Sequence, residues 1–511
     1  MERLTFNIRT SGGTDVVAGR TAGRPTFARV TAPVTATIAT AKQQIATARE
    51  RYDADYLCML AFTTLLFFRP QDHIPALGVL HLAELTAIGG LAAMAVRRLS
   101  SGKTIAHVNG EVVGVIALGA IFVLTIPFSI WPGGSLALFS DVFVKVILIF
   151  ALMVSTITSP RRIRQMTWIM ITASGYIASR AVFDYLRGVN LVEGNRVRGA
   201  LGGMFENPND LALNLVTFLA PTLFIIFEEK KAFRRLVACA IAVAMLAAIV
   251  FTKSRSGFLG LIGMTAVVLY YVAKVKPAVV GGALLVGMMA LPMMPSSFWD
   301  RMDSIFNAEE DPTGSRAARL RLFDQGMEVF LENPVTGIGA GQFQNYDAPG
   351  MIEKWRVTHN VWLQVAAELG MFGLMIFAFL VTRAYTSSFA ALRMLRTSSR
   401  RRAAPVANGG LRPSAPRSHP QFNPQPAVRH PHYALSDEER RLMANNAKGM
   451  IAAMVGWTIC ALFASVAFNW TFYYVFALAV AGRDIMLTRR VTAEEPAAKH
   501  VHVQNLVRAT A

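Results

Sequence analysis

The chain has 511 residues, of which 53% are hydrophobic and only 16% are charged, and its mean hydropathy is +0.40. A soluble chain usually carries about 25% charged residues. These values exclude a disordered chain, a disulfide scaffold and an ordinary cytosolic enzyme, and they indicate a polytopic membrane protein. The cysteines Cys58, Cys239 and Cys460 lie in separate apolar runs, which excludes a cysteine zinc site and a disulfide framework.

The chain begins with a polar segment and continues with a series of apolar runs. Residues 1–51 are rich in Thr, Ala and Arg, and we expect a disordered, basic cytoplasmic tail without a cleavable signal peptide. Each later run approaches the ~20 residues that cross a bilayer core as a helix. The runs are 52–68, 76–96, 111–130, 136–158, 163–183, 211–228, 235–252, 256–273, 277–295, 360–382, 449–468 and 471–487. The sequence therefore predicts an all-α membrane protein with about 12 transmembrane helices.

The basic residues are distributed unequally between the two sides of this topology. With a cytoplasmic N-terminus, 37 of the 51 Lys and Arg residues fall on the inner side and 13 on the outer side. Cytoplasmic loops of membrane proteins carry such an excess. It explains the net charge of +19 without a nucleic-acid partner. The inner side also receives the basic, Pro-rich insertion 383–448 and the tail 488–511.

Two longer segments, 184–210 and 296–359, lie on the predicted outer, periplasmic side. Long loops in a compact bundle are usually functional. Within the second, Arg316–Glu332 has helical apolar spacing and ends at Asn333-Pro334, a helix stop. Its apolar positions are Leu320, Phe323, Met327, Phe330 and Leu331. We expect an amphipathic helix on the outer membrane surface or over the bundle, followed by a turn at the Gly-rich run 337–341.

Polar residues precede the three predicted spans that begin at 211, 256 and 360, which run from outside to inside. These lead-ins contain good N-cap residues, namely Asn209 or Asp210, Ser254, and Thr358 or Asn360. Helix N-termini and nearby Arg side chains favour anions. The lead-ins therefore predict a phosphate or pyrophosphate site at the outer face. The alternative is that each Arg only anchors its helix at the interface.

A few charged residues fall within the predicted spans. Asp141 and Lys145 are four residues apart on one helical face, which predicts a structural ion pair. Glu84 and Glu368 lie at mid-depth and could pair with a cation of the bundle.

Short motifs of the lead-ins and of the large loop resemble the O-antigen ligase and polymerase superfamily. These motifs are Ser254 to Gly260 at the start of a span, Arg319-x-x-x-Phe323 followed by Asn333 to Gly339, and His359-Asn360-x-x-Leu363 followed by Glu368 to Gly373. The stretch from Arg198-Gly199 to Asn207-Pro208-Asn209 is also similar to the family. The resemblance is strongest over 195–385. The chain departs from it at Phe323, where the family often has Trp, and in its long N-terminal tail and insertion.

The resemblance implies a GT-C-like glycosyltransferase of the bacterial inner membrane. Such an enzyme transfers an undecaprenyl-pyrophosphate-linked glycan to an acceptor hydroxyl at the periplasmic face, with inversion and without a metal or other cofactor. The residues support this chemistry, because Arg stabilises a departing pyrophosphate and His accepts a proton near neutral pH. We expect His359, Arg255 and Arg319 to be catalytic. The expected substrate-binding residues are Arg198, Arg196, Asn209, Asn360 and Arg316.

The acceptor and the class of function have alternatives at this point. The acceptor is lipid A-core in a ligase, another repeat unit in a polymerase of O-antigen or exopolysaccharide, or a protein. A transporter or flippase of lipid-linked glycans would use the same cations only to bind the headgroup, and it would also have charged residues along a path across the membrane. A membrane scaffold with basic inner loops is a third class.

Overall fold

A computed structural model describes residues 53–70, 74, 77, 80–102, 108–192, 195–199, 205–290, 292, 296, 298–299, 315–347, 355–402 and 435–509. The expected N-terminal tail and the central part of the expected cytoplasmic insertion lie outside these residues.

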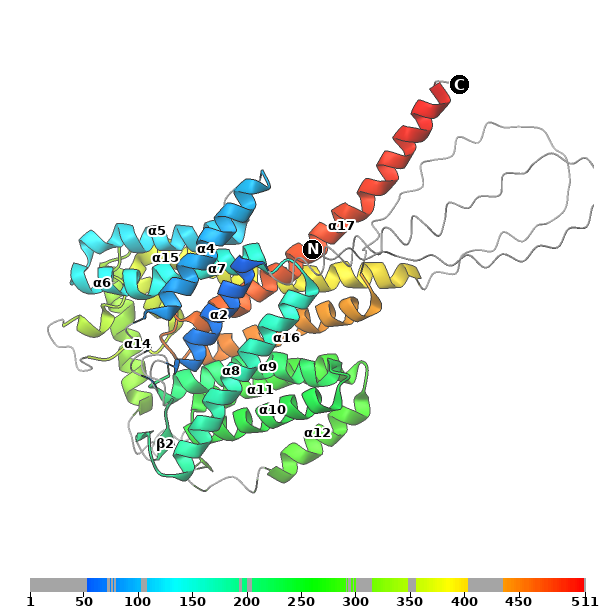
Figure 1. The fold of residues 1–511 in the computed structure, drawn as a ribbon. Coiled ribbons are helices and arrows are strands. Elements are labelled where there is room, and N and C mark those ends of the chain that lie inside the picture. The colour runs from blue at the N-terminus through cyan, green and yellow to red at the C-terminus, as the bar shows by residue number, and fades with distance from the viewer. Residues whose placement is uncertain are drawn as a thin grey trace, which may run out of the picture. The chain divides into compact units, whose positions relative to one another are not determined.

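Every apolar run of the sequence overlaps a helix (Figure 1). The helices are α2 (Ala54–Phe68), α4 (Leu82–Ser100), α5 (Gly110–Thr125), α7 (Val144–Thr156), α8 (Pro160–Leu186), α9 (Pro208–Glu228), α10 (Ala232–Thr252), α11 (Arg255–Ala273), α12 (Pro277–Ala290), α15 (Val361–Arg402), α16 (Asp437–Ala461) and α17 (Trp470–Ala509). In the described part of the chain, 6 helical segments are long and apolar enough to cross a membrane: Gly110–Phe128, Pro132–Thr156, Pro208–Glu228, Ala232–Thr252, Arg255–Ala273 and Val361–Arg396. The protein is therefore a polytopic helical membrane protein.

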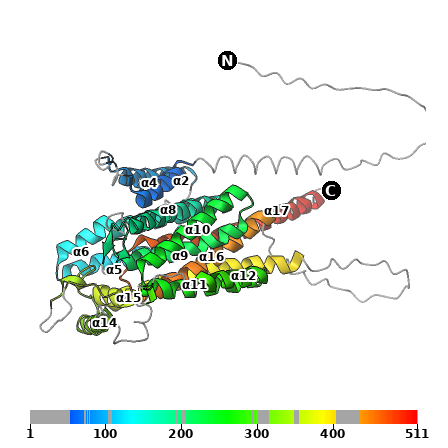
Figure 2. The same cartoon turned by 90° about the horizontal axis from the view of Figure 1, so that it is seen from below.

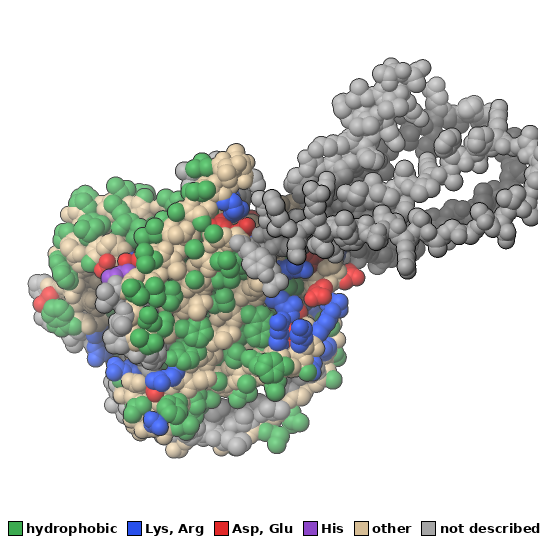
Figure 3. Space-filling view, viewed as in Figure 1, with side chains coloured by type: hydrophobic (Ala, Val, Ile, Leu, Met, Phe, Trp, Pro, Cys, Tyr) green, Lys and Arg blue, Asp and Glu red, His purple; other side chains and the backbone are tan. Residues whose placement is uncertain are grey.

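Helix α9 lies at the centre of the packing. It contacts α8, α10, α11 and α16, and Figures 1 and 2 show these helices running side by side. The apolar window of α9 is 78% buried, compared with 33% in α10 and 39% in α11. The outer faces of α10 and α11 are thus apolar and uncovered, as expected of helices that face lipid. Figure 3 shows hydrophobic side chains over most of the visible face, with Lys and Arg gathered at its margins.

The apolar run 136–158 is interrupted by a π-helical turn. Helix α6 (Pro132–Leu138) continues through the turn η3 (Phe139–Phe143) into α7. A π turn holds more residues than an α turn and rotates the side chains that follow it. The predicted Asp141–Lys145 pair is therefore wrong, and Lys145 Nζ instead donates to Glu84 Oε1 at 3.0 Å.

The amphipathic helix expected in the large loop is present as α14 (Ser315–Glu332). It packs on α15 through Ala318, Leu322 and Val329, which are buried. Four of the five apolar positions noted in the sequence are exposed, namely Leu320, Phe323, Met327 and Leu331, and Phe330 is half-buried. Both faces of this helix therefore carry apolar residues, one packed on α15 and one exposed. The exposed stripe suits contact with a membrane surface.

The segment after α14 inserts into a break in α15. Gly370 has φ 68° inside this helix, and Met371 N–H donates to the Pro334 carbonyl at 2.8 Å. Gly339 N–H donates to the Glu368 carbonyl at 3.0 Å. The Glu368 carboxylate accepts the Gly341 N–H at 2.8 Å, so it holds the Gly-rich turn, whereas the sequence had left open a pairing with a cation.

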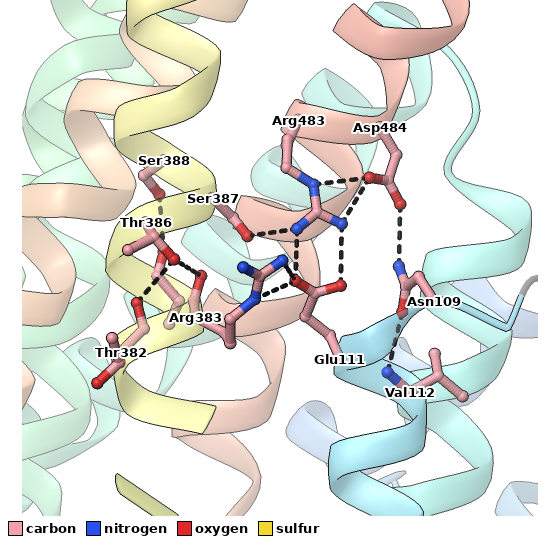
Figure 4. Close-up of polar contacts among 11 residues, drawn as sticks. Asn109, Glu111, Val112, Thr382, Arg383, Thr386, Ser387, Ser388, Arg483 and Asp484 are labelled. Carbon is pink, nitrogen blue, oxygen red and sulfur yellow. Dashed lines mark hydrogen bonds and ion pairs between the residues drawn. The ribbon is translucent and has the colours of Figure 1, made fainter. Parts of the chain in front are cut away.

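A buried charge cluster joins α5, α15 and α17 (Figure 4). Glu111, with a side chain only 1% exposed, pairs with Arg383 and Arg483. Arg383 Nε donates to it at 2.6 Å and Arg483 Nη2 at 2.9 Å. Arg483 also pairs with Asp484, which accepts from Asn109 Nδ2 at 3.0 Å. We refer to these residues as the Glu111 cluster, which ties three helices together.

Candidate functional site

Two neighbouring cavities meet at the ends of the helices where α9, α11 and α15 begin. The polar cavity, of about 410 Å³, is lined by Arg196, Arg198, Glu206, Asn209, Arg319, Arg356 and His359, among others. The apolar cavity, of about 360 Å³, is lined by Arg255, Leu259, Arg319, Leu320, Phe323, His359, Asn360, Leu462 and Phe463, among others. Arg319 and His359 line both cavities, so they mark the place where the two meet.

The polar cavity is built partly on the hairpin β1 (Leu191–Val192) and β2 (Arg196–Val197). Arg196 is 4% exposed. Its Nε donates to the Thr252 carbonyl at 3.0 Å and its Nη2 to Asn209 Oδ1 at 2.9 Å. Arg198 follows the strand, is exposed, and is held by its backbone N–H on the Asn190 carbonyl at 3.1 Å. The hairpin therefore fixes Arg196 inside the protein and leaves Arg198 facing the cavity.

A tight turn between α10 and α11 positions Arg255. Lys253 adopts φ 48° and ends α10. Ser254 Oγ then caps α11 by accepting the Gly257 N–H at 3.1 Å, and it donates to Asn209 Oδ1 at 2.8 Å. Arg255, half-buried, is the first residue of α11 and lines the apolar cavity. The turn thus joins the starts of α9 and α11 beside the cavities.

The backbone around His359 is held in a strained conformation. His359 has φ 50°, which is uncommon for a residue other than glycine and is often found at functional sites. Its N–H donates to Ser465 Oγ at 3.0 Å, and Thr358 Oγ1 lies 2.9 Å from the same oxygen. Asn360 Oδ1 accepts the Trp362 N–H at 2.9 Å and caps α15. The imidazole is therefore presented from a fixed turn at a helix start.

Helix α14 brings Arg319 to the junction of the cavities. Its Gly326 packs so closely on α15 that a Cβ there would lie 2.5 Å from Leu363 Cδ2. Leu322 is fully buried in a small core with Val329 and Ala367. With Leu322 turned into this core, Arg319, half-buried, lines both cavities.

The predicted N-caps are partly corrected. Ser254 and Asn360 cap their helices. Helix α9, however, is capped by Asn207, whose Oδ1 accepts the Asn209 N–H at 2.9 Å. Asn207 lies just before the helix, so its side chain reaches the free N–H groups of the first turn. Asn209 is already inside that turn. Asn209 is thereby released to accept hydrogen bonds from Arg196 and Ser254.

The structure brings together nearly all of the predicted site residues, although their roles stay predictions. They line one or both cavities: Arg196, Arg198, Asn209, Arg255, Arg319, His359 and Asn360. The side chain of Arg316 lies outside the described residues. The sequence reasoning missed Arg356 and Glu206, which also line the polar cavity. Arg356 lies only three residues before the predicted His359, and this closeness in the sequence was the signal that could have identified it.

The cavities combine positive charge with an apolar wall. Arg198, Arg319 and Arg356 line the polar cavity, whereas Glu206 contributes a carboxylate. The helix N-termini of α9, α11 and α15 lie at the same place and add positive potential. Such a site favours an anionic group that carries an apolar chain.

Comparison with known families identifies one match. Residues 240–378 match the family model described as O-antigen ligase. The matched segment includes Arg255, Arg319, His359 and Asn360, and it confirms the resemblance predicted from the motifs. Arg196, Arg198 and Asn209 precede it. A comparison with curated proteins gives no match.

Proposed function

We propose that this protein belongs to the O-antigen ligase and polymerase superfamily and transfers a polyprenyl-pyrophosphate-linked glycan to an acceptor hydroxyl. The observation that carries the proposal is the meeting of a polar and an apolar cavity at Arg319 and His359. A donor of this class has the same division, with an isoprenoid chain, a pyrophosphate and a sugar chain joined in that order.

We place the donor according to this division. The isoprenoid chain lies along Leu259, Phe323 and Phe463 in the apolar cavity. The pyrophosphate lies at the junction, where Arg255 and Arg319 reach it, and Arg198 contacts it from the polar cavity. Arginine suits this task because its planar guanidinium binds phosphate oxygens in pairs. Arg196 is buried, and it donates to the Thr252 carbonyl at the end of α10 and to Asn209, which also binds Ser254. In this scheme Arg196 therefore positions Asn209 and Ser254 and does not contact the phosphates.

The transfer step follows from these positions. The acceptor oxygen attacks the anomeric carbon of the donor sugar while the bond from that carbon to the pyrophosphate oxygen breaks. The pyrophosphate leaves on its polyprenyl carrier with the bonding electron pair, and Arg255 and Arg319 stabilise its charge. The proton of the acceptor hydroxyl passes to His359. Attack opposite the leaving group inverts the anomeric centre, and in this scheme arginines supply the positive charge without a metal.

The proposal includes the membrane orientation. Twelve spans place both termini in the cytoplasm and residues 296–359 in the periplasm, with the protein in the bacterial inner membrane. The cavities then open at the periplasmic face, where the exposed apolar stripe of α14 would contact the outer leaflet. Any of the three acceptor classes, lipid A-core, a glycan repeat unit or a protein, supplies the hydroxyl that this chemistry requires.

A purified-protein assay tests the proposal. The protein in detergent is incubated with a polyprenyl-pyrophosphate glycan and candidate acceptors, with EDTA present. We expect a glycosylated acceptor and free polyprenyl pyrophosphate in equal amounts. A micelle has no two sides, so a transporter would produce neither. Absence of product, together with movement of the lipid-linked glycan across proteoliposomes, would support the flippase instead. Product that is lost with EDTA and restored by a divalent cation would contradict the metal-free scheme.

A further inference from the structure

A groove lies far along the helices from the two cavities, between α11 and α15. Both helices pack on α16, which forms the floor of the groove through Ile451 and Val455. The groove has a volume of about 650 Å³. Tyr270 in its wall is 15 residues beyond Arg255, about 22 Å along the helix at 1.5 Å per residue. It is therefore separate from the proposed catalytic site.

The lining of the groove changes from apolar to basic along its length. The apolar part is lined by Ala266, Val267, Phe389, Leu392, Ile451 and Val455. At the other end lie the exposed Arg393 and Arg396. None of the described residues that line the groove is Asp or Glu. An anion at this end would therefore meet two guanidinium groups and no carboxylate of the lining.

Two of the three tyrosines that line the groove follow its apolar part on α11. These are Tyr270 and Tyr271, whereas Tyr385 lies at the other end of the apolar part, with its hydroxyl 2.9 Å from Thr458 Oγ1. Lys274 Nζ lies 3.8 Å from the centroid of the Tyr270 ring, which adds a further cation beside the groove. Tyrosine is enriched at the headgroup level of membranes, because its ring is apolar and its hydroxyl is polar. The rings of Tyr270 and Tyr271, the second with Lys448 Nζ 5.9 Å from its centroid, therefore mark the depth of a lipid headgroup.

We propose that this groove binds an anionic phospholipid, with its phosphate between Arg393 and Arg396 and an acyl chain along the apolar walls. Basic pockets between transmembrane helices on the cytoplasmic side bind anionic headgroups. Basic residues that only fix the membrane topology need no apolar cavity beside them. This groove has an apolar cavity next to its two arginines, as a lipid site requires. The assignment to the cytoplasmic leaflet rests on the orientation in the proposed function, but lipid binding itself does not.

Native mass spectrometry of the purified full chain tests the proposal. The protein is titrated with phosphatidylglycerol and with phosphatidylcholine of the same acyl chains. We expect a clear preference for phosphatidylglycerol in the wild type. The double variant Arg393→Gln/Arg396→Gln should bind it about 30-fold more weakly, from roughly fivefold for each charge near a lipid surface. The matched control Arg234→Gln/Arg235→Gln removes two exposed cations from the start of α10 and should keep wild-type binding.

Two further measurements separate a lipid site from a phosphate site. Val267→Trp fills the apolar part without changing charge, so it should also weaken phosphatidylglycerol binding. Glycerol phosphate, which has the headgroup anion without chains, should bind far more weakly than the lipid. Equal binding of glycerol phosphate and lipid, unchanged binding in the Arg393/Arg396 variant, or equal loss in the control would overturn the proposal. The assay contains no glycan donor, so its outcome is independent of transfer activity.

Discussion

Single side chains at the junction of the two cavities carry the proposed chemistry. His359 and Arg319 line both cavities, but they come from different elements and are positioned in different ways. His359 depends on a strained turn bonded to Ser465, whereas Arg319 depends on the packing of α14 against α15. The base and the leaving-group cation are thus positioned independently, and variants can separate their roles.

The first prediction concerns His359. His359→Ala should lower the rate of transfer about 10²–10⁴-fold, the usual contribution of a general base. Donor binding should persist, because the arginines remain. His359→Gln keeps a hydrogen-bonding group that orients the hydroxyl but does not take its proton at neutral pH. Turnover and donor affinity are measured on purified protein of normal thermal stability. Near-wild-type turnover of His359→Ala would exclude both roles, and near-wild-type turnover of His359→Gln alone would exclude the base.

The second prediction compares two arginines on one helix. Arg319→Lys keeps the charge but loses the planar fork, so transfer should fall about 10–100-fold, in line with the roughly 1.5–3 kcal/mol of a charge-assisted hydrogen bond. Arg321 lies two residues away and is not among the residues that line either cavity. Arg321→Lys should therefore retain wild-type transfer. Similar losses in both variants, measured at matched protein levels, would indicate a general effect on α14 instead.

At the scale of elements, the sequence predicted which residues meet at the cavities better than it predicted the packing. Three polar lead-ins precede spans of the same direction, and alternation of spans alone brings Arg198, Arg255 and His359 to one side. The sequence suggests Asn209 as a helix cap, because residue preferences at helix ends do not show that Arg196 and Ser254 both donate to its side-chain oxygen. The π turn before Lys145 could not be predicted, because one extra residue in a helical turn leaves the hydropathy of the run unchanged. Contacts between residues far apart in the sequence determine all of these details, and the spacing of residue types does not reveal such contacts.

The third prediction tests the break in α15. Gly370 has φ 68°, and a Cβ there would collide with the Val335 carbonyl oxygen. Gly370→Ala should therefore detach the 333–341 segment and lower the unfolding free energy by more than about 2 kcal/mol. Gly281→Ala in α12, where a Cβ would meet nothing within 4 Å, is the matched control and should be neutral or stabilising. Equal melting temperatures for the two variants in detergent would contradict this account of the break.

The fourth prediction concerns the Glu111 cluster. Glu111→Gln leaves Arg383 and Arg483 without the carboxylate that they share, and breaking a buried charge pair costs about 3–5 kcal/mol. Glu84→Gln removes the pair with Lys145, in which the side chains are 48% and 35% exposed, so it should cost at most about 1 kcal/mol. Thermal melting in one detergent compares the two. A larger loss in Glu84→Gln than in Glu111→Gln would show that the cluster does not tie the helices together.

At the scale of the whole molecule, the orientation connects the charge distribution to the site. In the proposed topology, the excess of Lys and Arg lies on one side of the membrane, and the lead-ins, α14 and both cavities lie on the other side. A polyprenyl-linked donor has its reactive pyrophosphate at a membrane surface, so a site at the helix ends can meet it without a path through the bundle. If the orientation were reversed, the cavities would face the cytoplasm, and the basic groove between α11 and α15 would face the outer leaflet.

The fifth prediction tests this orientation directly. Asp347 lies in the large loop and Lys230 between α9 and α10, and both are exposed. Each is changed to cysteine in a background where Cys58, Cys239 and Cys460 are replaced by Ala. In cells whose outer membrane alone is permeabilised, a membrane-impermeant maleimide should label Asp347→Cys but not Lys230→Cys. Lys230→Cys should react only after the inner membrane is opened. The reverse pattern would place the cavities in the cytoplasm and remove the basis for a periplasmic transferase, because His359 and Arg319 lie on the same side as Asp347 in the proposed topology.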